Sequence, residues 1–187
     1  MAQHERVVLL DDTGVGIGAA LKAEVHHTDT PLHLAFSCYL FNEAGTHVLV
    51  TRRALEKKTW PGVWTNAFCG HPEPFENIPA AVKRRARQEL GIDVDDLRLA
   101  LPDFRYRAVD ASGIVENEIC PVYIARAKDE PVLNPDEAIE ARWVRPADLA
   151  AAARLTPWAF SPWMVEQVAQ LAIHEPEFDA VPAGSMP

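Results

Sequence analysis

Two glutamates that alternate along an expected strand are the first residues whose spacing indicates chemistry. In "GIVENEICPVY", Glu116 and Glu118 are two positions apart, so both side chains point to the same face of a strand. Two like charges side by side are unfavourable in a strand. A bound cation removes this conflict, and so does a proton shared by the two carboxylates, which raises the pKa of one of them. The pair therefore indicates a metal site or an acid–base site.

Three histidines can add further ligands to a metal held by these carboxylates. His26 and His33 flank "HTDTPL", and His71 follows a glycine in an expected loop. Three imidazoles with one or two carboxylates suit magnesium or manganese, and the nitrogen donors favour manganese, iron or zinc. Taken singly, a histidine is more often a surface residue than a ligand, and His27 is an alternative to its neighbour His26.

Cys69 precedes His71 by two positions and is a candidate for proton transfer. A buried, inert thiol is the usual interpretation of a cysteine. Nearby cations and a metal-binding histidine would instead lower the pKa of the thiol, so that it exchanges protons with a ligand. Cys120 shares the alternating face of the two glutamates and is the second candidate.

A helix expected over about 77–90 carries two charges on its apolar side. Arg85 and Glu89 fall within about 20° of the centre of the apolar stripe. Burying charges is costly unless each finds a partner. An ordinary ion pair one turn apart is the alternative, and it contributes only about 0.3–0.5 kcal/mol. We therefore predict that Arg85 contacts an anionic oxygen and that Glu89 contacts a metal bridging to it.

Further cations and aromatic residues suit the same kind of pocket. Arg52, Arg53, Lys57 and Lys58 gather within seven residues of an acidic chain, which indicates attraction of an anion. Arg52 and Lys58 are interpreted as solvated.

Aromatic residues in two segments have two interpretations. Tyr106 lies in "FRYRA", and "TPWAFSPWM" brings Trp158, Phe160 and Trp163 together. Core packing is the ordinary interpretation. An indole face above a pocket would also stabilise a carbocation, by about 2 kcal/mol or more when water is excluded.

Composition limits the class of protein. The chain has 187 residues, a net charge of −9 and a pI near 5.2, which argue for one domain and against a nucleic-acid partner. No apolar run approaches the roughly 18 residues that span a bilayer, and no signal peptide is recognised. We expect a cytoplasmic protein without a membrane partner, with a single domain over 1–174 and a Pro-rich tail over 175–187.

The elements that must position these residues are strands and helices in mixed order. Strand patterns occupy 6–10, 33–41, 47–52, 97–108, 117–126 and 139–144, and helical patterns occupy 77–90, 146–153 and 161–173. This order predicts an α/β (α+β) fold, a mixed β-sheet flanked by helices. Gly14, Gly16 and Ala19 match a loose dinucleotide-binding pattern. The string "DDTG" directly after the first strand is typical of a turn, so we interpret these glycines as part of an ordinary turn.

The stretch "GHPEPFENIPAAVKRRARQELGI" resembles the Nudix box, a loop and helix that hold a diphosphate and a divalent metal. The matching positions are Gly70, Glu76, Arg84, Glu89, Gly91 and Ile92. Two of the three acids of the helix are replaced, by Arg85 and Gln88. Over nearly its whole length the chain resembles the type I isopentenyl-diphosphate Δ-isomerases, in "HTDTPLHLAFS", "TRRALEKKTWPGVWTNAFCGHP", "FRYRA", "GIVENEICPVY" and "TPWAFSPWM".

This resemblance implies a Nudix-like fold and a set of roles. A divalent metal, Mn²⁺ or Mg²⁺, would be bound by His26, His33, His71, Glu116 and Glu118. The catalytic pair would be Cys69 and Glu118, with Tyr106 supporting Glu118 and Trp163 covering the cationic carbon. The diphosphate would be bound by Arg53, Lys57 and Arg85, with Lys22 a further contact and Glu89 holding Mg²⁺. The resemblance implies no flavin or nicotinamide, and a monomer or homodimer.

The implied reaction interconverts isopentenyl and dimethylallyl diphosphates through a tertiary carbocation, in isoprenoid biosynthesis. A box that keeps its diphosphate contacts and loses its water-activating acids is consistent with chemistry at the hydrocarbon end. The rival interpretations are a Nudix hydrolase, which predicts an intact run of acids, and a noncatalytic diphosphate- or metal-binding module.

Overall fold

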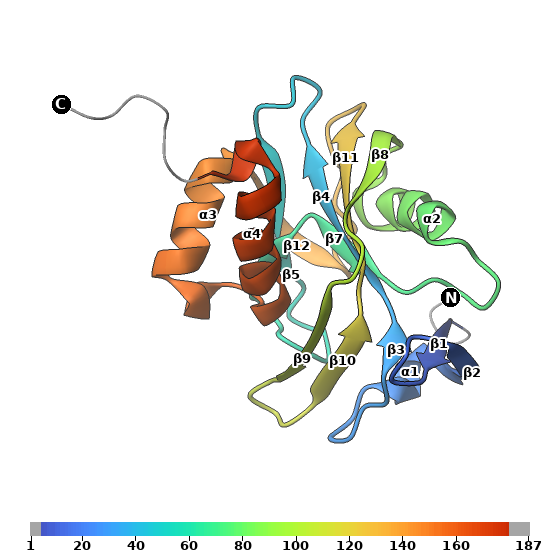
Figure 1. The fold of residues 1–187 in the computed structure, drawn as a ribbon. Coiled ribbons are helices and arrows are strands. Elements are labelled where there is room, and N and C mark those ends of the chain that lie inside the picture. Colours follow the sequence, from blue (N-terminus) through green and yellow to red (C-terminus); the bar gives the residue numbers. More distant parts are fainter. Residues whose placement is uncertain (1–4, 180–187) are drawn as a thin grey trace.

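The computed structural model describes residues 5–179, whose strands form two mixed sheets (Figure 1). The smaller sheet has the order β2 (Gly16–Leu21), β1 (Arg6–Leu10), β3 (His33–Leu34), β10 (Val115–Ile119) and β9 (Arg105–Val109). The larger has the order β12 (Ala138–Val144), β5 (Val48–Arg53), β4 (Phe36–Phe41), β11 (Val122–Ala127) and β8 (Val94–Leu101). Two short strands extend it, β6 (Trp64–Asn66) beside β5 and β7 (Phe68–Gly70) beside β4. The predicted mixed α+β class is confirmed, with two sheets where one was expected.

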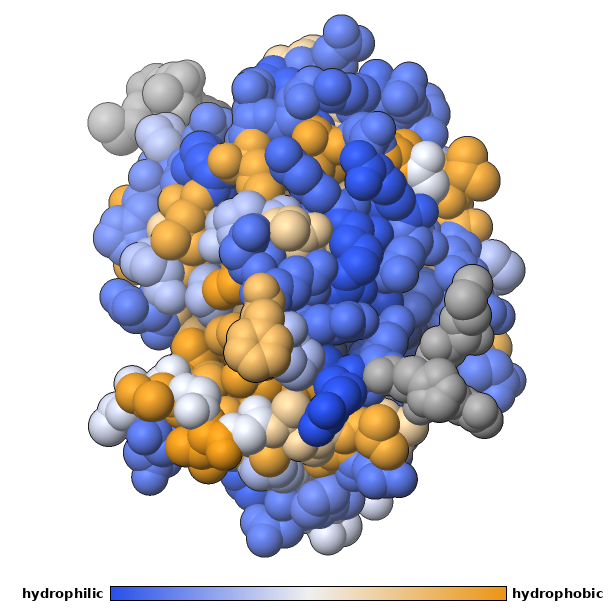
Figure 2. Space-filling model, turned by 90° about the vertical axis from the view of Figure 1, so that its right-hand side faces the viewer, coloured by the Kyte–Doolittle hydropathy of each residue, from blue (hydrophilic) through white to orange (hydrophobic). Residues whose placement is uncertain are grey.

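Helices cover both faces of the larger sheet (Figure 1). Helix α2 (Ile78–Leu90) lies on one face, and α3 (Pro146–Leu155) and α4 (Pro162–His174) lie on the other. The shorter helices are α1 (Lys22–Val25), η2 (Pro157–Ala159) and η3 (Pro176–Phe178). Among residues 5–179, no helix is long and apolar enough to cross a membrane. The face that carries α2 is hydrophilic over much of its area, with apolar side chains gathered mainly towards its lower edge (Figure 2).

Local sequence signals explain where α2 and α4 begin and end. The side-chain oxygen of Asn77 accepts a hydrogen bond from the N–H of Ala80, and Gly91, with φ 64°, ends α2 in the left-handed region. Ser161 precedes α4, but its hydroxyl lies 2.8 Å from that of Thr65 and does not cap the helix.

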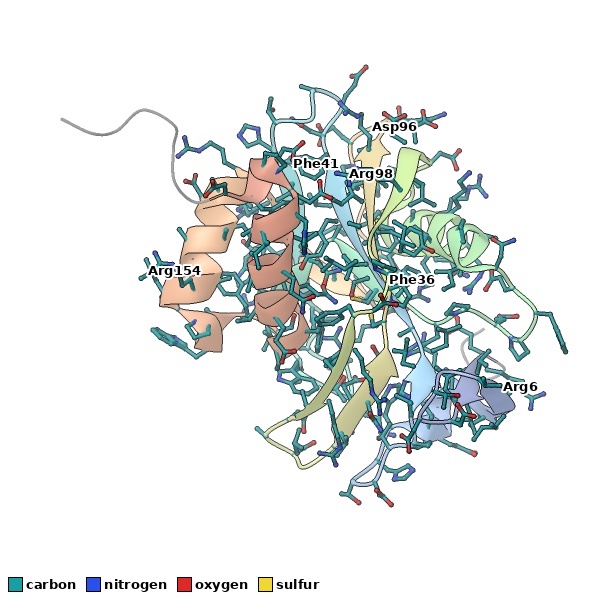
Figure 3. All side chains as sticks on the ribbon, viewed as in Figure 1. Arg6, Phe36, Phe41, Asp96, Arg98 and Arg154 are labelled. Atoms are coloured by element: carbon teal, nitrogen blue, oxygen red, sulfur yellow. The ribbon has the colours of Figure 1, made fainter. Side chains whose placement is uncertain are left out.

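Strand β4 is buried along its whole length because helices cover both of its faces. Phe36, Cys38 and Leu40 pack on the α2 side, whereas Tyr39 and Phe41 pack on the side of α3 and α4. Figure 3 shows Phe36 inside the molecule, while Arg154 on α3 projects outwards. A strand covered on both faces has no polar alternation, which explains the continuous apolar run in the sequence.

Three of the expected strands divide, with one part in each sheet. The run 33–41 divides at Ala35, whose N–H donates to the carbonyl of Ile119 at 3.0 Å. The run 117–126 divides before Pro121, whose carbonyl accepts from the N–H of Ser37 at 3.1 Å. Proline has no N–H for a ladder, so a break at this position is expected. The expected run 97–108 likewise divides into β8 and β9.

The glycine-rich segment after β1 forms a hairpin. Strands β1 and β2 pair antiparallel, and the side chain of Asp11 accepts from the N–H groups of Thr13 and Val15 in the turn. An antiparallel hairpin has no crossover helix, so the interpretation as an ordinary turn is confirmed. Strands β2, β6 and β7 were not expected, since β2 was assigned to this turn and the other two are only three residues long.

The prediction that the chain leaves the core after His174 is wrong for one residue. Phe178 is fully buried and its ring packs edge-to-face on Tyr39 and Phe41, at 5.7 and 6.0 Å between centroids. A buried aromatic ring removes a large apolar area from water, which holds η3 against the sheet. The rest of the expected tail, 180–187, lies outside the described residues.

Candidate active site

A cavity of about 400 Å³ collects nearly all of the residues that the sequence singled out. The predicted residues that line it are Lys22, His26, Arg53, Lys57, Cys69, His71, Arg85, Glu89, Tyr106, Glu116, Glu118 and Trp163. His33 is fully buried and does not line the cavity, although it contacts Glu118, which does. The volume lies in the range of small-ligand sites, about 300–1,000 Å³.

Three imidazoles and one carboxylate meet at one side of this cavity. His26, His33, His71 and Glu118 each offer one ligand atom, and these atoms lie within 4.8 Å of one another. Nδ1 of His71 is buried and has no hydrogen-bond partner within residues 5–179, and the buried Nε2 atoms of His26 and His33 face carboxylate oxygens of Glu116 and Glu118, at 3.0 and 3.3 Å. Unpaired buried nitrogens are costly, and a divalent cation would satisfy them. The donor set of nitrogens and carboxylate oxygens therefore fits a divalent metal.

The pKa values of the two imidazoles nearest Glu118 shift in opposite directions. Nε2 of His71 lies 3.0 Å and Nε2 of His33 lies 3.3 Å from Oε1 of Glu118. Burial lowers the pKa of His71 to about 3, against the attraction of Glu118. Burial also acts to lower the pKa of His33, but its hydrogen bond and attraction to Glu118 outweigh burial and raise that pKa. The neutral His71 imidazole can thus offer a lone pair to a metal without first losing a proton.

Glu116 adjoins this cluster through His26. Its Oε2 lies 3.0 Å from Nε2 of His26, and its Oε1 accepts from the hydroxyl of Thr59 at 2.7 Å. His27 uses its ring nitrogen Nδ1 to accept from the N–H of Asp29. Of the two adjacent histidines, His26 is therefore the one that belongs to the cluster of imidazoles and carboxylates.

Cys69 stands on β7 with its sulfur inside a hydrogen-bonded group. Its Sγ lies 3.3 Å from Oγ of Ser37 and 3.3 Å from both side-chain polar atoms of Asn66. Burial raises the pKa of the Cys69 thiol to about 11, although these hydrogen bonds act in the opposite direction. The prediction of a lowered pKa is wrong, because the desolvation of the thiolate exceeds the effect of the nearby cations.

Glu118 is held as a carboxylate by its partners. Tyr106 donates its hydroxyl hydrogen to Oε2 of Glu118 at 2.9 Å. Burial acts to raise the pKa of Glu118, but its hydrogen bonds with His33 and His71 outweigh burial and hold the pKa well below its usual range. The cavity thus contains a thiol that keeps its proton at neutral pH and a carboxylate that is free to accept one.

Trp163 forms an aromatic wall of the cavity. Its indole N–H donates to Oδ1 of Asn66 at 3.1 Å. The ring lies 5.7 Å from that of Tyr106 and 5.4 Å from that of Trp60, and the guanidinium of Arg53 lies 5.3 Å from its centroid. By contrast, Trp158 is 78% exposed and does not line the cavity.

Arg85 forms with Glu89 the ion pair that was the alternative to ligand contact, and this pair lies inside a larger charged group. Its Nη2 lies 2.6 Å from Oε1 of Glu89 and 3.1 Å from Oε1 of Glu137, and its Nη1 lies 3.8 Å from Oε1 of Glu5. Burial raises the pKa of Glu89 despite the attraction of Arg85. Sequence reasoning did not find Glu5 or Glu137, which come from distant segments and match no motif.

Other cations surround Arg85. Lys57 contacts Glu137, and Lys22 lies 2.7 Å from Oε2 of Glu5. Burial, and then the nearby charge of Arg85, lowers the pKa of Lys22. Lys58 is among the lining residues but is exposed, so its interpretation as a solvated residue is confirmed, and Arg52 is not among the lining residues. Together these cations form an anion-attracting end of the cavity, opposite in character to the thiol and the aromatic rings.

Glu76 supports the loop that carries His71. Its carboxylate accepts two hydrogen bonds from Arg84, at 2.8 and 2.7 Å, and Arg84 also donates to the carbonyl of His71 at 3.1 Å. Glu76 does not line the cavity. This box residue therefore orders the loop and has no direct place in the site.

Comparisons with known proteins agree with this arrangement. A family model described as the NUDIX domain matches residues 31–164. A protein from Agromyces mediolanus named isopentenyl-diphosphate Delta-isomerase is 60% identical over 163 residues, 87% of this chain and 79% of its own. One of the same name from Paenarthrobacter aurescens is 60% identical over 171 residues, 91% of this chain and 92% of its own.

Solved structures show the same fold at low sequence identity. The protein DR0079 from Deinococcus radiodurans has a TM-score of 0.67 and 21% identity, and the match covers 89% of this chain and 98% of that one. A MutT protein from Methanosarcina mazei has a TM-score of 0.55 and 19% identity, covering 73% of this chain and 89% of that one.

Proposed function

The chain is an enzyme of the isopentenyl-diphosphate Delta-isomerase family, with a Nudix domain, and on this premise we propose that it interconverts isopentenyl and dimethylallyl diphosphates. The observation that carries the proposal is that the thiol of Cys69, the carboxylate of Glu118 and the indole of Trp163 line one cavity. Such a set can add a proton to a double bond and remove another.

Proton transfer by these two groups accounts for the shift of the double bond. The thiol of Cys69 gives its proton to the terminal carbon of isopentenyl diphosphate, and the electrons of the S–H bond stay on the sulfur. The tertiary carbocation then loses a proton from the neighbouring carbon to Glu118, and those C–H electrons form the new double bond. The reverse reaction exchanges the two roles.

The aromatic wall would lower the energy of the carbocation. Trp163 is only 3% exposed to solvent. A cation over an indole face is stabilised most when water is excluded in this way. Tyr106 would support this step by holding one oxygen of Glu118, which leaves the other oxygen to the histidines.

The cationic end of the cavity suits the diphosphate. We assign the diphosphate contacts to Lys22, Arg53, Lys57 and Arg85. Glu89 would hold a Mg²⁺ ion that arrives with the diphosphate, since a carboxylate beside bound phosphates is a usual magnesium ligand. Before such binding, Arg85 and Lys57 are neutralised by the carboxylates of Glu89 and Glu137.

The histidine cluster suits a resident divalent metal, Mn²⁺ or Mg²⁺. We assign its ligands as His26, His33, His71, Glu116 and Glu118, since the buried nitrogens of the first three either face a carboxylate or have no hydrogen-bond partner among residues 5–179. A metal bound there would supply positive charge that fixes the Glu118 carboxylate in one orientation.

Two other functions predict different residues. A Nudix hydrolase needs the carboxylates that activate water, and Arg85 and Gln88 stand at two of those positions. A noncatalytic binding module does not need a thiol and a carboxylate in the same cavity as an indole. Isoprenoid biosynthesis, a cytoplasmic location and a monomeric or homodimeric state remain predictions.

Proton NMR of the purified protein with isopentenyl diphosphate and Mg²⁺ in deuterated buffer tests the proposal. Growth of dimethylallyl signals with deuterium incorporation supports the isomerase and the proton-transfer mechanism together. Release of inorganic phosphate or pyrophosphate without isomerisation would favour the hydrolase, and an unchanged spectrum would favour the binding module.

A further inference from the structure

Ser37 lies directly behind the sulfur of Cys69. The two residues are register partners in the antiparallel pair of β4 and β7, and their Oγ and Sγ atoms are 3.3 Å apart. Ser37 has no exposed surface and does not line the cavity, whereas Cys69 does. On the other side, Oγ of Ser37 lies 3.4 Å from Sγ of Cys120. One buried hydroxyl therefore bridges two thiols.

The other polar neighbour of Cys69, Asn66, has little capacity left for the sulfur. Its amide N–H₂ group has two hydrogens, and carbonyls of Cys38 and Phe68 accept from it at 3.1 and 2.8 Å. Its carbonyl oxygen accepts from the Thr65 hydroxyl at 2.9 Å and from the Trp163 indole at 3.1 Å. Both donor positions and both acceptor positions of this amide are thus filled by other partners. Its contact with Cys69 can only be a weak, shared (three-centre) hydrogen bond.

Ser37, in contrast, has one hydrogen and one lone pair free for the thiols. Gln167 donates from Nε2 to Oγ of Ser37 at 2.9 Å. At the far end of this buried chain, Oε1 of Gln167 accepts from the hydroxyl of Tyr39 at 3.1 Å. A hydroxyl has one donor and two acceptor positions, so one of each remains for Cys69 and Cys120.

We propose that Ser37 is a positioning residue for proton transfer by Cys69. The hydroxyl of Ser37 turns between the thiols of Cys69 and Cys120 during turnover. In the resting enzyme the S–H of Cys69 donates to Ser37 and the Ser37 hydroxyl donates to Cys120, and the S–H turns towards the cavity when the double bond of the substrate is bound. When Cys69 has given its proton to the substrate carbon, Ser37 turns its own hydrogen to the thiolate and accepts from the S–H of Cys120. No bond to hydrogen breaks in Ser37, and return of the proton to Cys69 restores the first arrangement. This role rests on the proposed isomerase function.

The substitution Ser37→Ala tests the role, because it removes the hydroxyl and leaves the thiols in place. The hydrogen bond from Ser37 to the Cys69 thiolate forms only after proton transfer, so its removal affects the reaction and not substrate binding. We therefore expect kcat to fall about 10- to 100-fold while KM stays within about two-fold. Tyr39→Phe is the matched control. It removes the hydroxyl at the far end of the same buried chain and touches neither thiol, so it should lower stability to a similar degree and keep kcat.

The infrared S–H stretching bands give a second measurement that does not depend on turnover. Cys69→Ala and Cys120→Ala identify the band of each thiol. In Ser37→Ala the bands of both thiols should shift towards that of a free thiol, and in Tyr39→Phe they should not. A purely structural role would lower stability in both variants without this difference.

The outcomes separate the two proposals. Isomerisation by the wild type with a selective loss of kcat in Ser37→Ala, together with shifted S–H bands, supports the role of Ser37. Wild-type isomerisation with unchanged kcat in Ser37→Ala, or with an equal loss in Tyr39→Phe, overturns that role and leaves the isomerase intact. A wild type that does not isomerise isopentenyl diphosphate overturns both.

Discussion

His33 on β3 and Glu118 on β10 are direct register partners in a parallel strand pair. On the other side of β10, Glu118 pairs with Tyr106 on β9, which donates to it. An imidazole, a carboxylate and a phenol are thus placed in a row by the register of three strands. Because a slip of one residue turns a side chain to the opposite face of a sheet, the pairing itself fixes the candidate base and its partners.

Removal of either proposed proton-transfer group should nearly abolish turnover. We expect Cys69→Ala and Glu118→Gln each to lower kcat by about 10²- to 10⁴-fold, the usual contribution of a positioned acid or base, while substrate binding survives. Rates of isomerisation and binding of the substrate by calorimetry measure the two effects. Cys38→Ala is the control, because Cys38 is buried and lies outside the cavity lining. Full activity in either test variant would discard the assignment.

Substitutions at Trp163 should follow the size of the remaining aromatic face. Both Trp163→Phe and Trp163→Leu lose the hydrogen bond to Asn66, so their difference reports the ring alone. A cation–π contribution of about 2 kcal/mol corresponds to roughly 30-fold in rate, so Leu should be slower than Phe by about that factor in kcat. Equal kcat values in the two variants would contradict stabilisation of a carbocation by the indole.

Removal of divalent metal should lower the melting temperature. At a metal concentration 100 times Kd, binding stabilises a protein by about 2.7 kcal/mol, which is roughly 5–11 °C in Tm for a chain of this size. Calorimetric scans of chelator-treated protein, with and without Mn²⁺, measure this shift. His33→Ala should remove most of it, and no shift in the wild type would argue against the metal site.

Thr59→Val should weaken the binding of the divalent metal without removing one of its ligands. The Thr59 hydroxyl donates to Oε1 of Glu116. Loss of a hydrogen bond that orients a metal ligand lowers metal affinity by about 10- to 100-fold, so we expect a loss of roughly 30-fold. Titration of the metal-free variant with Mn²⁺ gives the affinity directly. An unchanged Kd would mean that Glu116 does not contribute to the site.

Gly70→Ala should damage the cavity through contact with its neighbours. An added Cβ would lie 2.8 Å from Cγ of Arg85 and 2.9 Å from Cζ of Phe36, which Figure 3 shows in the interior. Overpacking of this kind costs about 1–3 kcal/mol, and displacement of Arg85 should raise KM. Gly18→Ala is the matched control, since no atom lies within 4 Å of its added Cβ. Denaturant unfolding and steady-state kinetics measure both effects, and equal behaviour of the two variants would contradict the close approach.

Much of the site was accessible from sequence because chemistry depends on residue type and local spacing. The alternation of Glu116 and Glu118, the apolar-side charges Arg85 and Glu89, and the long strings shared with a known family singled out residues that the structure brings to one cavity. The apolar run over 33–41 likewise predicted a strand, and its larger part forms β4.

Tertiary structure decided what local spacing does not encode. Glu137 neutralises Arg85 from 52 residues away, and Ser37 meets Cys69 and Cys120 only through the pairing of strands. The sign of the Cys69 pKa shift also depended on burial, because desolvation depends on every atom that surrounds the sulfur and its cost exceeds the attraction of neighbouring cations. Sequence specified which groups are present, and the packing of distant segments set their partners and their charge.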